Sequence, residues 1–578
     1  MRCRHILPLL LAASTSLAAR QLDDYEYVVV GSGAGGGPLA ARLALAGHKT
    51  LLIEAGDDQG SNYNYSVPAY SALASEDERL AWNFFVRHYA DDERQSRDYK
   101  ASYDTPDGGI YTGRTPPPGS RLKGTLYPRT NTLGGCTAHN ALITIYPHRS
   151  DFDAIARLTG DQTWAAVNMR KYFKRLEKNN YLSLDIPGHG HDGWLSVEQP
   201  PITIALKDQQ LLNLVTAGAA VKGRTILDLI TGDANNEAEL RDVDGGVYQI
   251  PVVTRKGVRN GPREFVLAVR DAKNKDGTKQ YPLDVRTSCH VTKVVFDKAK
   301  DRDQKPRATG VEFLDGAYLY RASPRANRDA GAGRGTPGCR GSGRRRSSRG
   351  SASRSWPTCA ADVLGDRGSY ASPGFAAAIM HRTGGAAEYD TFVFGGPVNF
   401  RGYFPRYSVN ITERHDQWTW AVLKNHPRNN AGRVTLRSAD PLDVPDIVFN
   451  YFDTGSGEYR KDLDAIAEAI GLARTAFKAS LTPSREILPG PDVTTRDAVD
   501  RYIMDTAWGH HASCTCPIGA DGDPMAVLDS SFRVRGVAGL RVVDASVFPR
   551  IPGSFTALST YMVSEKAAEV ILEQLEKS

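Results

Sequence analysis

Cysteine is scarce in this chain, which has seven among 578 residues. So few scattered cysteines cannot form the dense disulfide framework of a small secreted domain. Cys514 and Cys516 form a C-x-C pair, but no second pair stands at the spacing of a zinc site. The adjacent His510 and His511 do not change this, because neighbours in sequence rarely face one ion. We therefore expect no metal site.

Long apolar runs are also rare. Outside the N-terminus none approaches the roughly 20 residues that a membrane-spanning helix requires, so no membrane association is expected. The N-terminal run, residues 6–13, is shorter, follows two arginines and precedes small residues. That order is typical of a secretory signal peptide rather than a membrane anchor, and it predicts that residues 1–19 are removed and the protein is secreted. The sequons at Asn64 and Asn410 agree with a secreted glycoprotein.

The chain has no general surplus of basic residues. Its 72 basic and 66 acidic residues give a net charge of +6. Nine Arg but only one Asp lie between Arg325 and Arg354, and the remainder has no basic excess. A folded nucleic-acid-binding protein spreads positive charge over a face instead of confining it to one segment. We therefore expect no nucleic-acid partner.

The rest of the composition is that of a globular protein, with 41% hydrophobic and 24% charged residues. Helix-like and strand-like segments alternate along it, which predicts a mixed α/β architecture. Helices are predicted at residues 38–46, 165–177, 461–479 and 559–575. Strands are predicted at residues 25–30, 50–54, 291–296, 433–436, 444–450 and 540–543.

The first predicted strand leads into a glycine-rich turn. Gly31, Gly33 and Gly36 form G-x-G-x-x-G before a helix, and Glu54 ends the next strand. The first glycine permits a tight turn, the second lets the backbone approach a pyrophosphate, and the third lets helix and strand pack closely. The helix N-terminus favours phosphate, and the acid can accept from ribose hydroxyls. This context predicts dinucleotide binding, because a glycine-rich surface turn explains neither the strand nor the acid.

Three further blocks contain residue types that suit a ligand cavity. Residues 131–140 read NTLGGCTAHN, where a double glycine lets the backbone come close to a flat or charged ligand. Residues 508–519 place paired histidines among small side chains, which suggests an imidazole at a cavity wall. The last block, residues 540–553, reads LRVVDASVFPRIPG. None of the three is specific by itself.

Together, in this order and spacing, the four blocks resemble the glucose–methanol–choline (GMC) oxidoreductases, and most of all the secreted fungal members of that family. The resemblance covers roughly residues 25–320 and 380–575. It implies an α/β fold with a Rossmann-like FAD-binding domain and a second, substrate domain built on an antiparallel sheet. The FAD domain would comprise residues 25–160, 281–320 and 511–578, and the substrate domain residues 161–280 and 375–510.

The resemblance also implies the chemistry. His511 aligns with the general base that removes the hydroxyl proton while a hydride leaves for the flavin, so that an alcohol becomes a carbonyl compound. Reoxidation would use O2 or another acceptor. Implied FAD contacts are Gly31, Gly33, Gly36, Glu54, Gly134, Gly135, His139, Asn140, Val291, Asp544 and Ala545. The block at 134–140 is closest to the choline oxidase form, so His139 is a candidate for an 8α-histidyl bond; the alternative is non-covalent FAD packed beside it.

One departure from the family pattern concerns the active site. Counted back without gaps from Glu565 and Lys566, Phe555 stands where the family carries a second His or Asn. A phenyl ring cannot hydrogen-bond an alkoxide. This leaves open an FAD-containing member that catalyses a non-redox step, such as a ring closure in secondary metabolism.

A second departure is the Arg/Gly/Ser-rich tract at residues 325–370. With almost no large apolar side chains it is expected to be disordered. It stands where the family's other signature should follow residues 308–313. Such a bias is what GC-rich coding DNA yields in the wrong frame, so we hypothesise a frameshift or mis-called intron around residues 327–370. If the mRNA encodes the tract as written, part of the flavin pocket is missing and an inactive chain is the alternative.

Overall fold

The computed structural model describes residues 22–184, 186–297, 305–319, 368–414, 416–453 and 457–577. The predicted signal peptide and all but the last three residues of the Arg/Gly/Ser-rich tract lie outside these residues, so both remain predictions. No described helix combines the length and the hydropathy needed to cross a lipid bilayer.

A three-stranded parallel sheet contains the glycine turn. Its order is β1 (Tyr27–Val30), β2 (Thr50–Ile53), β12 (Leu283–Arg286). The connection between β1 and β2 is α1 (Gly36–Leu45), which confirms the predicted strand–helix–strand unit. β2 is buried throughout, as expected for an apolar run in the middle of a parallel sheet.

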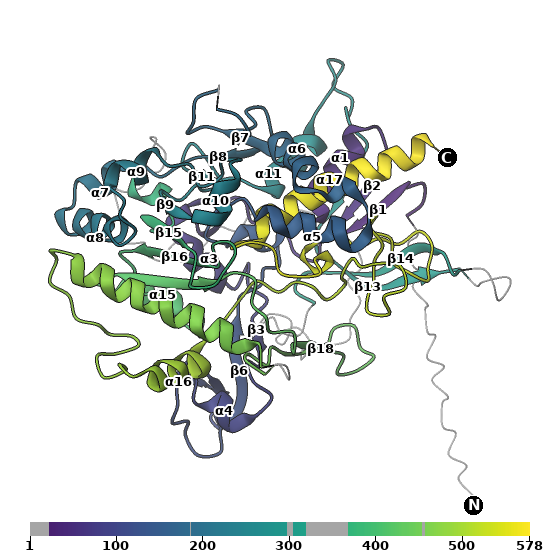
Figure 1. Ribbon diagram of the computed structural model, residues 1–578. Helices are drawn as coiled ribbons and strands as arrows, with labels where there is room; N and C mark the ends of the chain where they lie inside the picture. Colours follow the sequence, from purple (N-terminus) through teal and green to yellow (C-terminus); the bar gives the residue numbers. More distant parts are fainter. Residues whose placement is uncertain are drawn as a thin grey trace, which may run out of the picture.

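Two helices from distant parts of the chain cover α1: α11 (Pro262–Asp271) and α17 (Thr556–Glu576). The guanidinium of Arg42 on α1 donates to the fully buried Glu565 carboxylate on α17, with Nε 2.8 Å from Oε2. Figure 1 shows β1, β2, α1 and α17 together at one end of the molecule. α11 therefore packs with the parallel sheet, although residues 161–280 are predicted to belong to the substrate domain.

A four-stranded antiparallel sheet forms the second layer, as the sequence predicts. Its order is β17 (Thr419–Lys424), β16 (Thr391–Gly396), β15 (Ala377–His381), β9 (Gly246–Tyr248). Two helices contact this sheet and each other, α8 (Gln209–Ala220) and α15 (Tyr459–Ala479). Figure 1 shows α15 running beneath β15 and β16.

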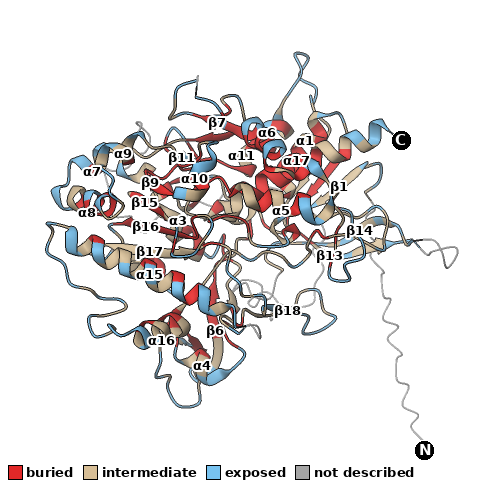
Figure 2. Ribbon diagram, in the orientation of Figure 1, coloured by how far each residue is buried: buried red, intermediate tan, exposed pale blue. Residues whose placement is uncertain are grey.

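The main hydrophobic core lies between these two units. It joins α5 (Arg149–Thr159), α6 (Ala166–Leu176) and α17 with strands of the antiparallel sheet. Figure 2 shows the buried residues concentrated in this central region, while the outer helices carry exposed faces. Other described elements include β3 (Phe84–Val86), β4 (Ser102–Asp104), β5 (Ile110–Thr112), β6 (Arg121–Tyr127), β13 (Cys289–Phe296), β14 (Ala308–Asp315), β18 (Arg433–Thr435), β19 (Asp446–Val448) and α16 (Arg496–Thr506).

The strand predicted at residues 540–543 is wrong. This segment makes only an isolated bridge, between Arg541 and Arg533. The carbonyl of Leu540 accepts from Val534 N, and Val542 N donates to the carbonyl of Phe532. These apolar residues therefore lie in a loop that is hydrogen-bonded to another loop, residues 532–534. The other predicted helices and strands are confirmed to within a few residues.

Candidate active site

The glycine turn between β1 and α1 requires glycine at Gly31 for its backbone conformation and at Gly36 for lack of room. Gly31 has φ +88°, and its N–H donates to the carbonyl of Ile53 at 2.8 Å. A Cβ on Gly36 would lie 2.1 Å from the carbonyl oxygen of Gly31. The turn can therefore close only with glycine at these positions, and its bare backbone faces outward.

The second sequence block packs directly on this turn. A Cβ on Gly135 would lie 2.8 Å from the Cα of Gly33, so the two backbones are in contact. Gly134, at φ +99°, donates its N–H to Ser32 Oγ at 2.9 Å. Gly134 is buried, does not line the cavity described below and helps to hold the turn; its contact with the cofactor stays a prediction.

The last block closes the other side of the turn. A Cβ on Gly35 would lie 1.8 Å from the carbonyl oxygen of Val543. Asp544 Oδ1 accepts from the N–H of Ser546 at 2.8 Å, which orders the short helix that follows. The carbonyl of Ala545 accepts from Cys514 N at 3.3 Å. The C-terminal block therefore bridges the glycine turn and the histidine block.

These blocks line one continuous cavity of about 3370 Å³. Ligand sites are typically concave and formed between structural units, and this one extends from the parallel sheet to the antiparallel sheet. The residues named from the sequence that line it are Gly31, Gly33, Gly36, Glu54, Gly135, His139, Asn140, Val291, His511, Asp544 and Ala545.

Glu54 lies at the cavity wall but is engaged with the turn itself. Its carboxylate accepts from Ser32 N and Oγ, at 2.9 and 2.6 Å, and from Gly56 N at 3.0 Å. Burial raises the pKa of Glu54, and these hydrogen bonds oppose that rise. The carboxylate fixes the shape of the turn; its predicted contact with ribose hydroxyls stays a prediction.

Sequence reasoning missed a charged pair beside His139. Burial by itself would raise the pKa of the Cys136 thiol, but the Arg129 guanidinium and the His139 imidazole outweigh it and lower that pKa to about 5. Cys136 stands inside the block at 131–140, yet nothing in the sequence brings Arg129 to it. The Nε2 atom of His139 is buried and has no hydrogen-bond partner among the described residues. Both His139 and Arg129 line the cavity.

His511 is held among rings. Its centroid lies 4.2 Å from that of His510 and 5.7 Å from that of Phe555. Burial lowers the pKa of His511 to about 4, and no charged group contributes to that shift. At neutral pH the imidazole is therefore uncharged and able to accept a proton.

His510 has a packing role. Its ring stacks on Trp508 at 5.5 Å and meets Tyr403 edge-on at 5.0 Å. Burial, followed by the nearby His511, lowers its pKa well below the usual range. Of the two histidines, His511 lies next to Phe555, which in turn packs against Phe392 at 5.2 Å. The wall beside His511 is therefore apolar.

Comparison with known proteins explains this arrangement. The model of the GMC oxidoreductase family matches residues 49–328 with its N-terminal part and residues 427–564 with its C-terminal part. The chain belongs to the GMC oxidoreductase family. Its sequence is 26% identical to an oxygen-dependent choline dehydrogenase of Vibrio vulnificus (strain YJ016), over 96% of this chain and 95% of the relative. It is 27% identical to an alcohol dehydrogenase [acceptor] of Pseudomonas putida, over 96% of each.

Solved structures share the GMC fold. A formate oxidase variant of Aspergillus oryzae RIB40 superposes with a TM-score of 0.68 at 17% identity, over 96% of this chain and 99% of that one. A fungal aryl-alcohol oxidase gives 0.61 at 17% identity, over 96% and 100%. At these identities the likeness shows the fold alone.

The residues of this GMC chain fit FAD. The turn brings the backbone of Gly31, Gly33 and Gly36 to the cavity, and α1 presents its N-terminus there, which suits a pyrophosphate. The adjoining cavity continues past His139, which lines it and whose Nε2 is buried without a hydrogen-bond partner among the described residues. It then reaches His511. The cavity can therefore hold a dinucleotide at one end and a substrate at the other.

Proposed function

We propose that this chain is an FAD-dependent oxidoreductase that oxidises an alcohol CH–OH group to a carbonyl, with O2 or another acceptor reoxidising the flavin. The observation that carries the proposal is that the glycine turn and the uncharged His511 line one cavity. Membership of the GMC family and relatives named as choline and alcohol dehydrogenases support it. Neither the family nor these relatives support the alternative hypothesis of a non-redox ring closure.

In this mechanism the protein positions the alcohol and moves its proton. FAD held along the glycine turn would supply the acceptor for the hydride. His511 lies in the cavity with its imidazole uncharged, so a ring nitrogen accepts the hydroxyl proton as the carbon loses its hydride. Phe555 and Phe392 exclude water from that side of the imidazole.

Anaerobic titration tests the function. Purified protein is mixed without O2 with a panel of aliphatic, aromatic and choline-type alcohols, and the flavin absorbance near 450 nm is followed. At least one alcohol should bleach the band and yield its carbonyl product in equal amount. Bound flavin that no alcohol reduces would contradict the proposal, and product formed without bleaching would point to a non-redox reaction.

The pH dependence of kcat/KM follows from the low pKa of His511. Since the base must be unprotonated and its pKa is about 4, kcat/KM should stay level from neutral pH down to about pH 5 and fall about tenfold per unit below pH 4. An ordinary histidine would lose activity already below about pH 6.5. A decline beginning there, with the circular dichroism spectrum unchanged, would contradict the assignment.

We propose further that His139 carries the flavin covalently. His139 lines the cavity, its buried Nε2 has no hydrogen-bond partner among the described residues, and the neighbouring Arg129 adds positive charge. After denaturation in acid, wild-type protein should keep its flavin, and its mass should exceed that of the apoprotein by one FAD. His139→Ala should release the flavin, while His48→Ala, which removes an imidazole that does not line the cavity, should not. Complete release of the flavin from the denatured wild type would contradict the covalent bond and show that the flavin is bound non-covalently.

We also propose that this is a secreted, fungal-type family member whose residues 1–19 are a signal peptide, as the N-terminal sequence suggests. Protein recovered from the culture medium should begin near residue 20 by N-terminal sequencing. Full-length protein retained in cells would contradict it. At the sequon of Asn64, the side-chain nitrogen donates to Asp77 at 2.9 Å. A glycan at Asn64 would have to break that hydrogen bond.

A further inference from the structure

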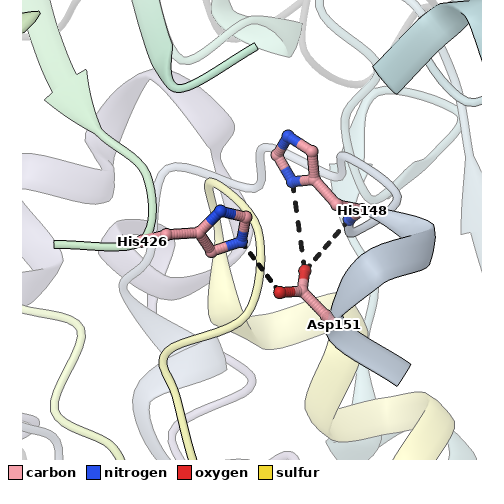
Figure 3. A group of neighbouring side chains, drawn as sticks. All are labelled: His148, Asp151 and His426. Atoms are coloured by element: carbon pink, nitrogen blue, oxygen red, sulfur yellow. Dashed lines mark hydrogen bonds and ion pairs between the residues drawn. The ribbon is translucent and has the colours of Figure 1, made fainter. Parts of the chain in front are cut away.

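Three side chains that do not line the cavity meet beside the antiparallel sheet: His148, Asp151 and His426 (Figure 3). His148 immediately precedes α5, Asp151 lies in the first turn of that helix, and His426 follows β17. His148 is fully buried, and the side chains of Asp151 and His426 are 3% and 10% exposed. A polar cluster so deep in the fold requires a partner for each polar atom.

Both imidazoles aim a ring nitrogen at the same carboxylate. His426 Nε2 lies 2.8 Å from Asp151 Oδ1, and His148 Nδ1 lies 3.9 Å from Asp151 Oδ2. Figure 3 shows both rings turned toward Asp151. Neither nitrogen makes a geometrically sound hydrogen bond with any described residue. The two rings are close to each other as well, with centroids 4.6 Å apart.

The second ring nitrogen of each histidine points away from Asp151 and has an oxygen atom of another residue near it. His148 Nε2 lies 2.8 Å from the carbonyl oxygen of Tyr389 and must donate to it. In the neutral ring, Nδ1 therefore carries a lone pair and no hydrogen. This lone pair faces the Asp151 carboxylate, so two hydrogen-bond acceptors lie opposite each other without a hydrogen between them. His426 Nδ1 lies 4.0 Å from Glu388 Oε1. A histidine that binds a metal usually presents its second nitrogen to a carbonyl or a carboxylate, as His148 does here.

The surroundings fix the carboxylate and balance its charge. Asp151 Oδ2 accepts from the backbone N–H groups of His148, at 3.1 Å, and Gly553, at 2.9 Å. Asp151 Oδ1 also accepts a hydrogen bond from the guanidinium of Arg550 at 3.1 Å. Glu388 supplies a second carboxylate beside His426, so a cation would enter a site that holds negative charge despite Arg550.

We propose that His148 Nδ1, His426 Nε2 and the carboxylate of Asp151 bind a divalent transition-metal ion, most suitably Zn²⁺. Two imidazoles and a carboxylate are a donor set that zinc favours. The three ligand atoms already lie within 4.8 Å of one another, so small side-chain movements bring all of them to coordination distance. The ion removes the conflict between the His148 lone pair and the carboxylate.

Such an ion would have a structural role. It would link α5, the segment after β17 and, through Asp151 and Gly553, the segment that carries Phe555 to His511. The ligands stand at 148, 151 and 426, so no local spacing in the sequence reveals them. The expectation of no metal site considered only the neighbouring cysteines and histidines of residues 510–516.

Metal analysis of the purified full chain tests the proposal. Elemental mass spectrometry should find about one zinc per chain. Chelator-treated protein, titrated with ZnCl2 alone, should recover that ion and unfold at a higher temperature. His148→Gln and His426→Gln should each weaken zinc binding at least about tenfold. His48→Gln, a surface histidine paired with Glu26, is the matched control and should bind like the wild type.

The titration of the wild type decides the matter even where a variant folds poorly. A wild-type chain that contains no metal and binds no zinc after chelator treatment would overturn the proposal. Equal binding by the wild type and the His148→Gln/His426→Gln double variant would also overturn it, because the ion would then lie elsewhere. Neither result depends on alcohol oxidation.

Discussion

Replacing His511 by alanine should lower kcat/KM for the alcohol substrate by about 10² to 10⁴-fold while the flavin remains bound. The uncharged imidazole lies on this part of the cavity wall and has an unprotonated ring nitrogen that can accept the hydroxyl proton. Its apolar neighbour Phe555, which packs against Phe392, offers no substitute. Stopped-flow measurement of anaerobic flavin reduction gives the rate directly.

The control for this experiment is His48→Ala, which removes a surface imidazole paired with Glu26 and should leave the reduction rate unchanged. The flavin content of His511→Ala should equal that of the wild type, so that the loss is one of rate. A reduction rate within about twofold of the wild type would exclude His511 as the general base.

Replacing Gly35 by alanine should yield protein without bound flavin. Its backbone is right-handed, with φ −87° and ψ −63°, so alanine suits the conformation. The added Cβ, however, would lie 1.8 Å from the carbonyl oxygen of Val543. Because the atom in the way belongs to the backbone, it cannot rotate aside as a side chain can. The C-terminal block, residues 540–553, must therefore move away from the glycine turn, and the FAD-binding site opens. The ratio of absorbance at 280 and 450 nm measures the loss.

A matched substitution separates this clash from the effect of any added methyl group. Gly310→Ala, on β14, places its Cβ in open space and should keep the full flavin content. A yellow Gly35→Ala protein with the wild-type absorbance ratio would show that the turn and the C-terminal block can separate without cost.

The parts of the fold that local sequence dictates were predictable. The β1–α1–β2 unit follows from an apolar run, three glycines and a second apolar run, and α15 and α17 follow from helical periodicity. His511 and the glycine turn were identified because the blocks that contain them resemble a family. In each case the signal lies within about 20 neighbouring residues.

The rest depends on contacts between distant segments. The fold places Arg129 close to Cys136. His426 lies next to Asp151 only because the end of β17 packs beside α5. Residues 540–543 have the composition of a strand, but their backbone partners belong to a loop at 532–534. Gly134 carries the family's glycine, yet it bonds to Ser32 beneath the turn. Residue type alone could not distinguish these outcomes.

The packing of α17 on α1 has a consequence for biosynthesis. Arg42 and Glu565 are separated by 523 residues, so one partner leaves the ribosome long before the other exists. Domains of a nascent chain generally fold as units once they are complete. α11 can cover part of α1 once residues 262–271 have emerged, but the face of α1 that α17 covers stays exposed, within reach of chaperones, until residues 556–576 have been made. Release of the finished polypeptide, and not formation of the early turn, is the event that makes cofactor capture possible.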